Sequence, residues 1–315
     1  MSDRRLAMLY HPSHHVPDLD RAEEFFERVF GRPSTPLSAL ARPGADGQPA
    51  RAGSVPDHSI FTPIADVLFD SIDPRRYVVG GERRYPDVER PHLKGMGFYV
   101  ADIHALYRSL RGAGVTVVDQ LDRVADGDEP PNAVGSALPL CFTVPDDAGL
   151  RYELVPRFPF PLDPRLADGW KLPPPSADDP LGIVRCAHHT VLTVHPERAL
   201  RLTLGAFGGT VVHRGRDDVL AATGTWVLLG DAIVEFAVPE PSSTVRDELA
   251  SAYPGDAYHS IAWQVLDLGR VERHLRSVDV GVVVRTDDTI VVDPDSALGV
   301  PWRFTTTPVP GDPRP

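Results

Sequence analysis

The stretch His11-Pro-Ser-His-His-Val-Pro-Asp-Leu-Asp-Arg-Ala-Glu-Glu-Phe-Phe decides the fold, because the chain contains four versions of it. The other three begin Gly95-Met-Gly-Phe-Tyr-Val-Ala-Asp-Ile, His189-Thr-Val-Leu-Thr-Val-His-Pro-Glu and Ser260-Ile-Ala-Trp-Gln-Val-Leu-Asp-Leu. Each version is an apolar run typical of a strand, followed by Asp or Pro and then by a helical pattern. Four copies of one strand–helix unit indicate an architecture built by repetition.

Each unit continues after its helix with further short strand-like runs. The helices are expected at about 18–30, 102–112, 196–205 and 267–277. A single unit would leave one apolar face of its sheet exposed, so the units should pair. We therefore predict an α+β fold in which four βαβββ modules pair into two open, mixed β-barrels. The expected modules are about 1–88 and 89–156 in the N-terminal half, and about 182–250 and 251–315 in the C-terminal half.

The segments between these patterns are rich in proline. Residues 157–181 are expected to form an ordered, extended linker between residues 1–156 and 182–315. Its apolar side chains can pack against the halves: Phe158, Phe160, Leu162 and Trp170. Residues 32–58 read as a polar loop, and residues 145–149 read as a hairpin turn.

The composition narrows the function classes. Of the 315 residues, 42% are hydrophobic and 24% are charged, as in a soluble globular protein. The net charge of -12 argues against a nucleic-acid partner, which would require a basic face. No apolar run is long enough for a membrane span, and the first residues do not resemble a signal peptide. With only Cys141 and Cys186, a disulfide framework is not expected, so the cytoplasm is the expected location. A homodimer is possible.

The motifs resemble those of the vicinal oxygen chelate superfamily, which includes glyoxalase I, bleomycin-resistance proteins and extradiol dioxygenases. Val16-Pro-Asp-Leu-Asp-Arg-Ala-Glu-Glu-Phe-Phe is similar to its strand-to-helix pattern. Leu150-Arg-Tyr-Glu-Leu-Val and Ala232-Ile-Val-Glu-Phe-Ala-Val-Pro resemble its last strand, in which the glutamate binds metal. The resemblance covers all four units. It implies that metal ligands come from the first and last strands of each unit.

We locate the first-strand ligand positions by counting back seven residues from the Asp or Pro at 18, 102, 196 and 267. These positions hold His11, Gly95, His189 and Ser260, and the last-strand positions hold Asp70, Glu153, Glu235 and Arg303. Side chains alternate along a strand, so Ser13 and His15 share the face of His11, whereas His14 points to the other face. In the third unit His188 likewise points away from the face of His189. Thr193 shares the face of His189. His259 is one residue out of register, and a bulge could bring it in.

The resemblance thus implies a metal site in either half. His11, Asp70 and Glu153 are the candidate ligands in the N-terminal half. His189 and Glu235 are the candidates in the C-terminal half, with His259 as a third ligand if a bulge turns it inward. Such a mixture suits one divalent ion per active barrel: zinc, manganese, nickel or iron(II). Arg303 cannot ligate a metal, but with Ser13 and Thr193 it could bind a small-molecule substrate.

A divalent ion with open positions can bind two neighbouring substrate oxygens and stabilise an enolate. Glu153 or His15 would then act as the general base. We favour an isomerase, epimerase or lyase of this kind. The first alternative is an extradiol-type iron(II) dioxygenase, although Ser260 and Arg303 stand where such enzymes carry ligands. The second is a non-catalytic small-molecule binding or resistance protein.

Overall fold

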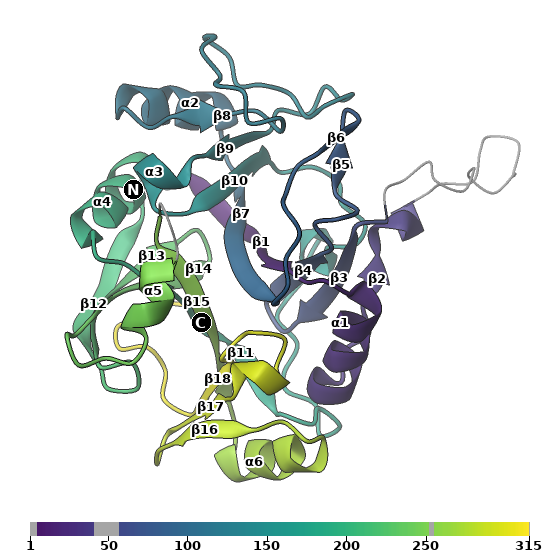
Figure 1. Ribbon diagram of the computed structural model, residues 1–315, viewed down its shortest axis with the longest axis vertical. Coiled ribbons are helices and arrows are strands. Elements are labelled where there is room, and N and C mark those ends of the chain that lie inside the picture. Colours follow the sequence, from purple (N-terminus) through teal and green to yellow (C-terminus); the bar gives the residue numbers. More distant parts are fainter. Residues whose placement is uncertain (1–4, 41–56, 252–254, 315) are drawn as a thin grey trace, which may run out of the picture.

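The protein is built from two similar sheets of eight strands. The computed structural model describes residues 5–40, 57–251 and 255–314, and Figure 1 shows the two halves one above the other. In spatial order, the first sheet contains β2 (Thr35–Pro36), β3 (Ser59–Ile64), β4 (Val67–Ile72), β1 (Leu6–His15), β7 (His92–Val100), β10 (Arg151–Pro156), β9 (Cys141–Thr143) and β8 (Val117–Val118). The second contains β12 (Thr210–Asp217), β13 (Ala222–Leu229), β14 (Ala232–Pro239), β11 (Ile183–Leu192), β15 (Ala257–Val265), β18 (Arg303–Thr305), β17 (Thr289–Val292) and β16 (Val282–Arg285).

The two sheets have the same topology, because the strand order of one is repeated in the other. In each sheet the first strands of two modules pair antiparallel at the centre, β1 with β7 and β11 with β15. Each of these strands pairs in parallel with the last strand of its own module. The prediction of four modules paired into two open, mixed sheets is therefore confirmed. A small separate hairpin consists of β5 (Val78–Val79) and β6 (Glu82–Arg83).

One helix follows the first strand of each module, as predicted. These helices are α1 (Leu19–Phe25), α2 (Ile103–Gly112), α4 (Pro196–Leu200) and α6 (Leu268–Ser277), and α1 and α4 continue into π-helical turns, Phe26–Phe30 and Arg201–Ala206. The carboxylates of Asp18, Asp102 and Asp267 accept hydrogen bonds from backbone N–H groups of the first turn. The third module differs, because its N-cap is His195 and Pro196 occupies the first turn.

The hairpin connection predicted at 145–149 is confirmed, because β9 and β10 pair antiparallel on either side of it. Its residues form the short helix α3 (Pro145–Ala148), because a proline at the first helical position suits a helix start. Residues 218–221 form the turn between β12 and β13. One further short helix is α5 (Arg246–Ser251). The polar loop predicted at 32–58 lies mostly outside the described residues.

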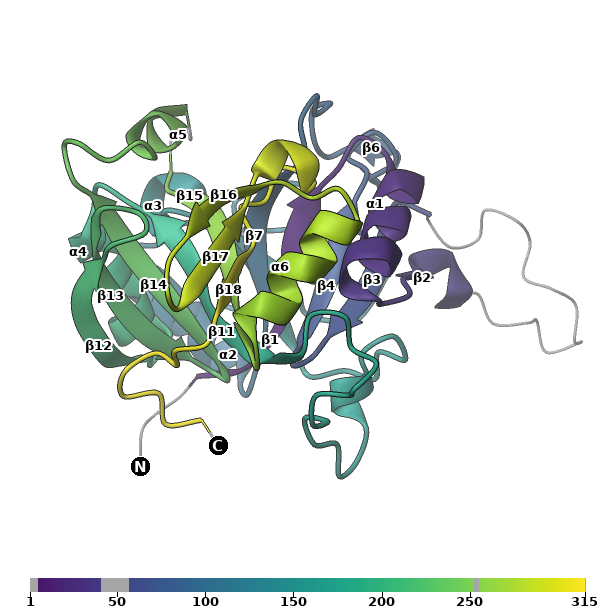
Figure 2. The same ribbon diagram turned by 90° about the horizontal axis from the view of Figure 1, so that it is seen from below.

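The halves share a continuous apolar core. The Phe30 ring lies 5.1 Å from that of Trp302, and Trp302 stacks on Trp263, with ring centroids 6.4 Å apart. In Figure 2 helix α6 lies beside α1, and His274 of α6 is hydrogen-bonded to the Val29 carbonyl, with Nε2 2.9 Å from the oxygen. Aromatic contacts of this kind hold the first and fourth modules together.

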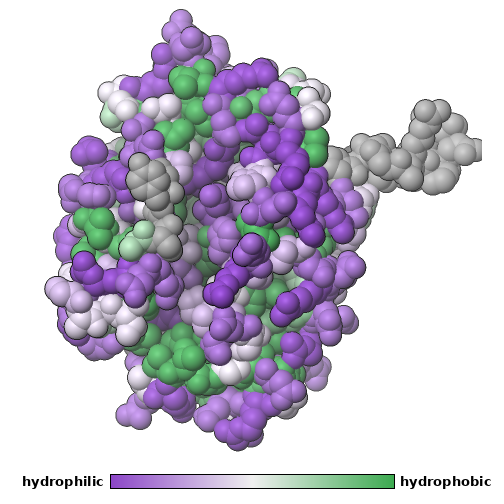
Figure 3. Space-filling model, viewed as in Figure 1, coloured by the Kyte–Doolittle hydropathy of each residue, from purple (hydrophilic) through white to green (hydrophobic). Residues whose placement is uncertain are grey.

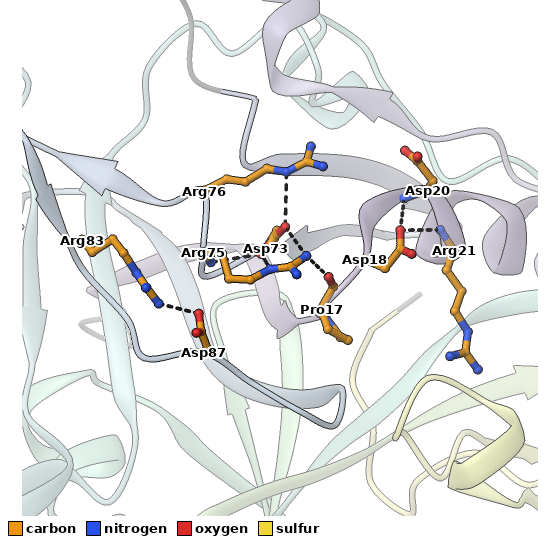
Figure 4. A network of polar contacts seen from close by, with 9 residues as sticks. All are labelled: Pro17, Asp18, Asp20, Arg21, Asp73, Arg75, Arg76, Arg83 and Asp87. Atoms are coloured by element: carbon orange, nitrogen blue, oxygen red, sulfur yellow. Dashed lines mark hydrogen bonds and ion pairs between the residues drawn. The ribbon is translucent and has the colours of Figure 1, made fainter.

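Polar contacts fix the end and the middle of β1, the strand that carries three of the predicted site residues. Beyond β4, Asp73 forms ion pairs with Arg75 and Arg76, and Arg75 also donates to the Pro17 carbonyl beside the Asp18 cap (Figure 4). In the linker, Arg165 is buried and donates to the Tyr10 carbonyl at 2.7 Å. The linker side chains Phe158, Phe160 and Leu162 pack against the N-terminal half, as predicted. No helix among the described residues is long and apolar enough to cross a membrane.

Candidate functional site

The strand register identifies equivalent positions in the four modules. In each module one last-strand residue is the parallel partner of the residue five places before the helix cap. These pairs are Ser13 with Asp70, Gly97 with Glu153, Thr190 with Glu235, and Ala262 with Arg303. The four last-strand positions derived from the sequence are therefore structurally equivalent.

The first-strand positions lie two residues further from the cap, and one differs from the prediction. Counting seven residues back from the observed caps gives His11, Gly95, His188 and Ser260. In the third module His188 therefore replaces His189, because the cap is His195 and not Pro196. Proline prefers the first helical position, and this preference is the signal in the sequence that identifies the cap.

The side chains of the C-terminal half follow this corrected register. Thr190 is paired with Glu235, so His188 shares the face of Glu235 and His189 points to the opposite face. There His189 is buried, with Nδ1 2.6 Å from the Tyr258 hydroxyl and Nε2 3.5 Å from Cys186 Sγ. The structure thus does not bring His189 and Glu235 together.

In the N-terminal half the predicted residues meet at one cavity of about 140 Å³. Its polar lining includes His11, Ser13, His15, Asp70 and Glu153, and its apolar lining includes Tyr10, Phe61, Tyr77, Tyr85 and Phe142. The buried His11 ring lies between the two carboxyl groups. Its Nδ1 is 3.7 Å from Asp70 Oδ2, and its Nε2 is 3.8 Å from Glu153 Oε2. Ser13 Oγ lies 3.3 Å from the same Nδ1.

Glycine at position 97 makes this arrangement possible. Gly97 is the cross-strand partner of both His11 and Glu153, so it separates them in one row across three strands. A Cβ atom at this position would lie only 3.2 Å from His11 Nε2 and 3.3 Å from the Tyr10 ring. The absence of a side chain therefore leaves the imidazole room to face Glu153.

The charges in this cavity are unbalanced. Burial raises the pKa of Asp70 well above its usual value, with a further contribution from Glu153, and burial raises the pKa of Glu153 to about 7. Burial lowers the pKa of His11 to about 3, so the ring is neutral at pH 7. Within the described part of the chain, neither carboxyl group forms an ion pair with lysine or arginine. Lys94 and Arg151 also line the cavity, and Arg151 opposes the rise in the pKa of Glu153, but neither cation forms an ion pair with the two acidic groups.

Further polar atoms in the cavity have no hydrogen-bond partner among the described residues: Asp70 Oδ1, His15 Nε2 and His58 Nδ1. The His15 ring lies 4.7 Å from the Tyr85 ring and 5.5 Å from His92. Burial lowers the pKa of His15 to about 2, with His92 and Lys94 adding to the effect. His58 was not predicted, because it precedes the predicted β3 strand and carries no repeat signal. Unpaired buried polar atoms are unusual and indicate a ligand or ion.

The donor set fits a partial metal site. Two ligands bound tetrahedrally to one ion at about 2.1 Å lie about 3.4 Å apart, close to the 3.8 Å between His11 Nε2 and Glu153 Oε2. Asp70 faces the other ring nitrogen, where a carboxylate orients a metal-binding imidazole. In residues 5–40, 57–251 and 255–314, no three His, Cys, Asp or Glu side chains converge on one point. Solvent or substrate oxygens would have to complete the coordination.

The equivalent position in the C-terminal half already contains a cation. Arg303 Nη1 lies 2.5 Å from Asp217 Oδ2 and 3.9 Å from Glu235 Oε2. Glu235 is fully buried; its Oε2 accepts a hydrogen bond from Thr190 at 2.8 Å and lies 3.4 Å from His188 Nε2. A guanidinium at this position opposes the approach of a second cation.

The other predicted residues of this half lie elsewhere. His259 Nε2 lies 3.3 Å from Glu248 Oε2, on the wall of a larger cleft between the halves. Thr193 Oγ1 accepts a hydrogen bond from the His195 backbone at 2.9 Å, at the start of α4. Arg303 is a buried partner of Asp217 and Glu235. The structure therefore does not gather His189, Glu235 and His259 into one ligand set.

Comparisons with known proteins agree with this fold. Scans against protein-family models and against curated proteins give no match. A mutant 4-hydroxymandelate synthase from Streptomyces coelicolor is similar in structure, with a TM-score of 0.60, 15% identity, and coverage of 95% of this chain and 92% of that chain. A 2,3-dioxygenase from a Pseudomonas species gives a TM-score of 0.57 at 12% identity, covering 98% and 95%.

A third similar structure is the Mn(II)-bound glyoxalase from Novosphingobium aromaticivorans, with a TM-score of 0.55, 11% identity, and coverage of 99% of this chain and 86% of that chain. All three likenesses extend over nearly the whole chain. The chain therefore has the same overall fold as these three proteins, in agreement with the fold that the resemblance of its motifs implied. At these identities the likeness establishes the fold alone, because this fold is used for many reactions.

Proposed function

We propose that the protein is a divalent-metal-dependent enzyme whose active site is the N-terminal cavity. Its substrate would be a small molecule with two neighbouring oxygens, from which it removes a proton beside a carbonyl group, as isomerases, epimerases and lyases do. The observation that carries this proposal is the pair of buried carboxyl groups around the neutral His11 ring, neither of which forms an ion pair with lysine or arginine in the described part of the chain. The equivalent Glu235, by contrast, has Arg303.

Each cavity residue has a role in this proposal. His11 Nε2 and Glu153 would hold the ion, while Asp70 and Ser13 orient the ring from its Nδ1 side. A bound divalent ion would supply electrophilic stabilisation of negative charge on a substrate oxygen. The aromatic lining would lower the polarity of the cavity once a substrate fills it, which would strengthen electrostatic interactions inside.

Glu153 is the better of the two candidate bases. The substrate would have to displace Glu153 from the ion before Glu153 could act as a base, and the freed carboxyl group, whose pKa burial raises to about 7, would then accept a proton near neutral pH. Burial lowers the pKa of His15 to about 2, so this ring would be a weak base and is better suited to forming a hydrogen bond. His15 is then a substrate-positioning residue in the same cavity, through its unpartnered Nε2 atom.

Elemental analysis of the purified protein tests this proposal. Manganese is the first ion to try, because one structure with this fold is described as Mn(II)-bound; zinc, nickel and iron(II) follow from the mixed nitrogen and oxygen donors. We expect about one ion per chain in the wild type and a loss of at least about tenfold in affinity in His11→Ala and Glu153→Gln. His188→Ala, at the equivalent position of the other half, is the matched control and should keep the ion.

Two results would contradict the proposal. If His11→Ala retained the wild-type metal content, or if only His188→Ala lost it, the site would not be in the N-terminal cavity. If the protein were isolated with iron and consumed oxygen with catechol-like compounds, the dioxygenase alternative would replace proton abstraction. A wild type that bound no divalent ion would favour the non-catalytic binding protein.

A further inference from the structure

A larger cleft of about 860 Å³ lies between the two halves. Its walls come from the start of β7 and the loop before β10 on one side, and from the start of β15 and residues 294–301 on the other. Figure 1 shows β7 and β15 on either side of the centre, and Figure 3 shows that face hollowed among mostly hydrophilic side chains. Lys94 and Arg151 line both this cleft and the smaller cavity of His11. They therefore mark the junction between the two spaces.

The acidic groups of the C-terminal wall have partners, whereas three cations of the N-terminal wall do not. The buried Asp256 pairs with Arg198 at 2.6 Å, and the exposed Glu248 lies 3.3 Å from His259. On the N-terminal wall, Lys94, Arg21 and Arg90 form no side-chain hydrogen bond or ion pair with any described residue. Two more exposed acids, Glu89 and Asp295, also line the cleft. Of the three unpaired cations, only Lys94 is partly buried and lines both spaces.

Lys94 is the central residue of this wall. It is half-buried, and burial lowers its pKa, with Arg151 adding to the effect. A partly desolvated ammonium group without a partner is unfavourable unless a ligand compensates it. The chain uses arginine almost everywhere and has only two lysines, Lys94 and the exposed Lys171.

Neighbouring groups complete a set of donors. Arg151 pairs with Asp122 at 2.7 Å and lies over the Phe142 ring at 4.3 Å, which fixes its side chain, and its buried Nε atom has no partner among the described residues. His15 is only 3% exposed, lines the small cavity, and its Nε2 atom also lacks a described partner. A positive side chain and a fixed guanidinium thus lie where the linings of cleft and cavity meet, with an imidazole on the cavity side.

We propose that Lys94, supported by Arg151 and His15, binds an anionic group of the substrate at this junction. This inference rests on the proposed function, in which the reacting oxygens lie near His11 and Glu153. It narrows the substrate to a small organic acid or phosphate ester whose charged end occupies the junction or extends into the cleft. Carboxylates and phosphate esters both carry negatively charged oxygens, which accept hydrogen bonds from an ammonium and a guanidinium group.

Binding of simple anions to the full-length protein, dialysed against a chelator, tests the subsite without any metal. Isothermal titration would compare malonate, inorganic phosphate and the neutral analogue malonamide. We expect at least one anion to bind, and malonamide to bind about 10- to 100-fold more weakly than malonate if the carboxylate is preferred. The relative affinities of malonate and phosphate distinguish the two sources of the anionic group.

The variants separate the subsite from general charge effects. Lys94→Gln should lower anion affinity by about 10- to 100-fold, and Lys94→Arg should retain most of it. Lys171→Gln, which removes the other lysine, should leave the affinity unchanged. In a parallel assay, malonate or phosphate should protect Lys94, but not Lys171, from acetylation followed by mass spectrometry.

Two results would overturn the inference. The first is a wild type that binds neither anion at concentrations up to about 10 mM, which is about ten times a weak Kd of 1 mM. The second is a Lys94→Gln variant that binds the anions as tightly as the wild type. The failure of this inference is separate from that of the proposed function. Loss of anion binding in Lys94→Gln with unchanged metal content would support the subsite, whereas a protein that binds anions through Lys94 but no metal would contradict the proposed function alone.

Discussion

Replacing Arg303 by methionine should destabilise the protein by about 3–5 kcal/mol at neutral pH, because the change leaves two buried carboxylates without their cation. Asp217 is 5% exposed and pairs with Arg303 at 2.5 Å, and Glu235 is fully buried 3.9 Å from the same nitrogen. The matched control is Arg285→Met. Arg285 lies on the exposed strand β16, 3.5 Å from Glu272, and such a surface pair contributes about 0–1 kcal/mol.

Urea unfolding followed by tryptophan fluorescence measures both changes, and the pH adds a second test. Burial alone would raise the pKa of Asp217, but Arg303 holds it below its usual value. The stabilisation from this pair is therefore present above the unfolded pKa and is lost as the pH falls through the folded pKa. The difference between wild type and Arg303→Met should shrink on acidification. If Arg303→Met cost no more than Arg285→Met at pH 7, the interpretation of Arg303 as the built-in cation of the C-terminal half would be refuted.

Three further predictions concern the N-terminal half. Burial lowers the pKa of His14 to about 3, so the folded state favours the neutral ring and loses stability as the pH falls below the pKa of His14 in the unfolded chain. Between pH 7 and 5 this residue should account for a loss of about 2 kcal/mol in the free energy of unfolding, and His14→Gln should remove that part of the pH dependence in urea unfolding. An unchanged pH dependence in the variant would contradict the lowered pKa. Gly97→Val should rotate the His11 ring and weaken manganese binding, measured by calorimetry, by about tenfold or more. The control is Gly112→Ala, where an added Cβ meets nothing within 4 Å and the affinity should not change. Equal affinities in the two variants would show that manganese binding does not depend on the position of the His11 ring. Asp70→Asn should lower metal affinity by about 10- to 100-fold while the protein remains folded. A complete loss of metal binding would instead show that Asp70 is itself a ligand.

Much of the fold follows from local signals in the sequence. The aspartate caps at 18, 102 and 267 each join an apolar strand to an amphipathic helix, and both signals depend on residues close in sequence. The last-strand positions could be aligned as well, because Leu150-Arg-Tyr-Glu-Leu-Val and Ala232-Ile-Val-Glu-Phe-Ala-Val-Pro resemble the same last-strand pattern. The failure at His189 shows how sensitive such counting is, since a shift of one residue turns a side chain to the other face of a sheet.

The electrostatic character of each half could not be predicted in this way. Whether Glu235 meets a cation depends on Arg303, which is brought to it by sheet pairing and held by Asp217 from β12. The same is true of Lys94, which has no motif of its own and gains its position only where cavity and cleft join. These contacts link residues far apart in sequence, and no local pattern encodes them.

A titration with Mn(II), followed by electron paramagnetic resonance of the free ion, tests the central claim most directly. The account predicts about one bound ion per chain in the wild type and in Glu235→Gln, and loss of that ion in Glu153→Gln, because Glu235 is paired with Arg303 whereas Glu153 forms no ion pair with lysine or arginine among the described residues. Binding that persists in Glu153→Gln and disappears in Glu235→Gln would contradict it.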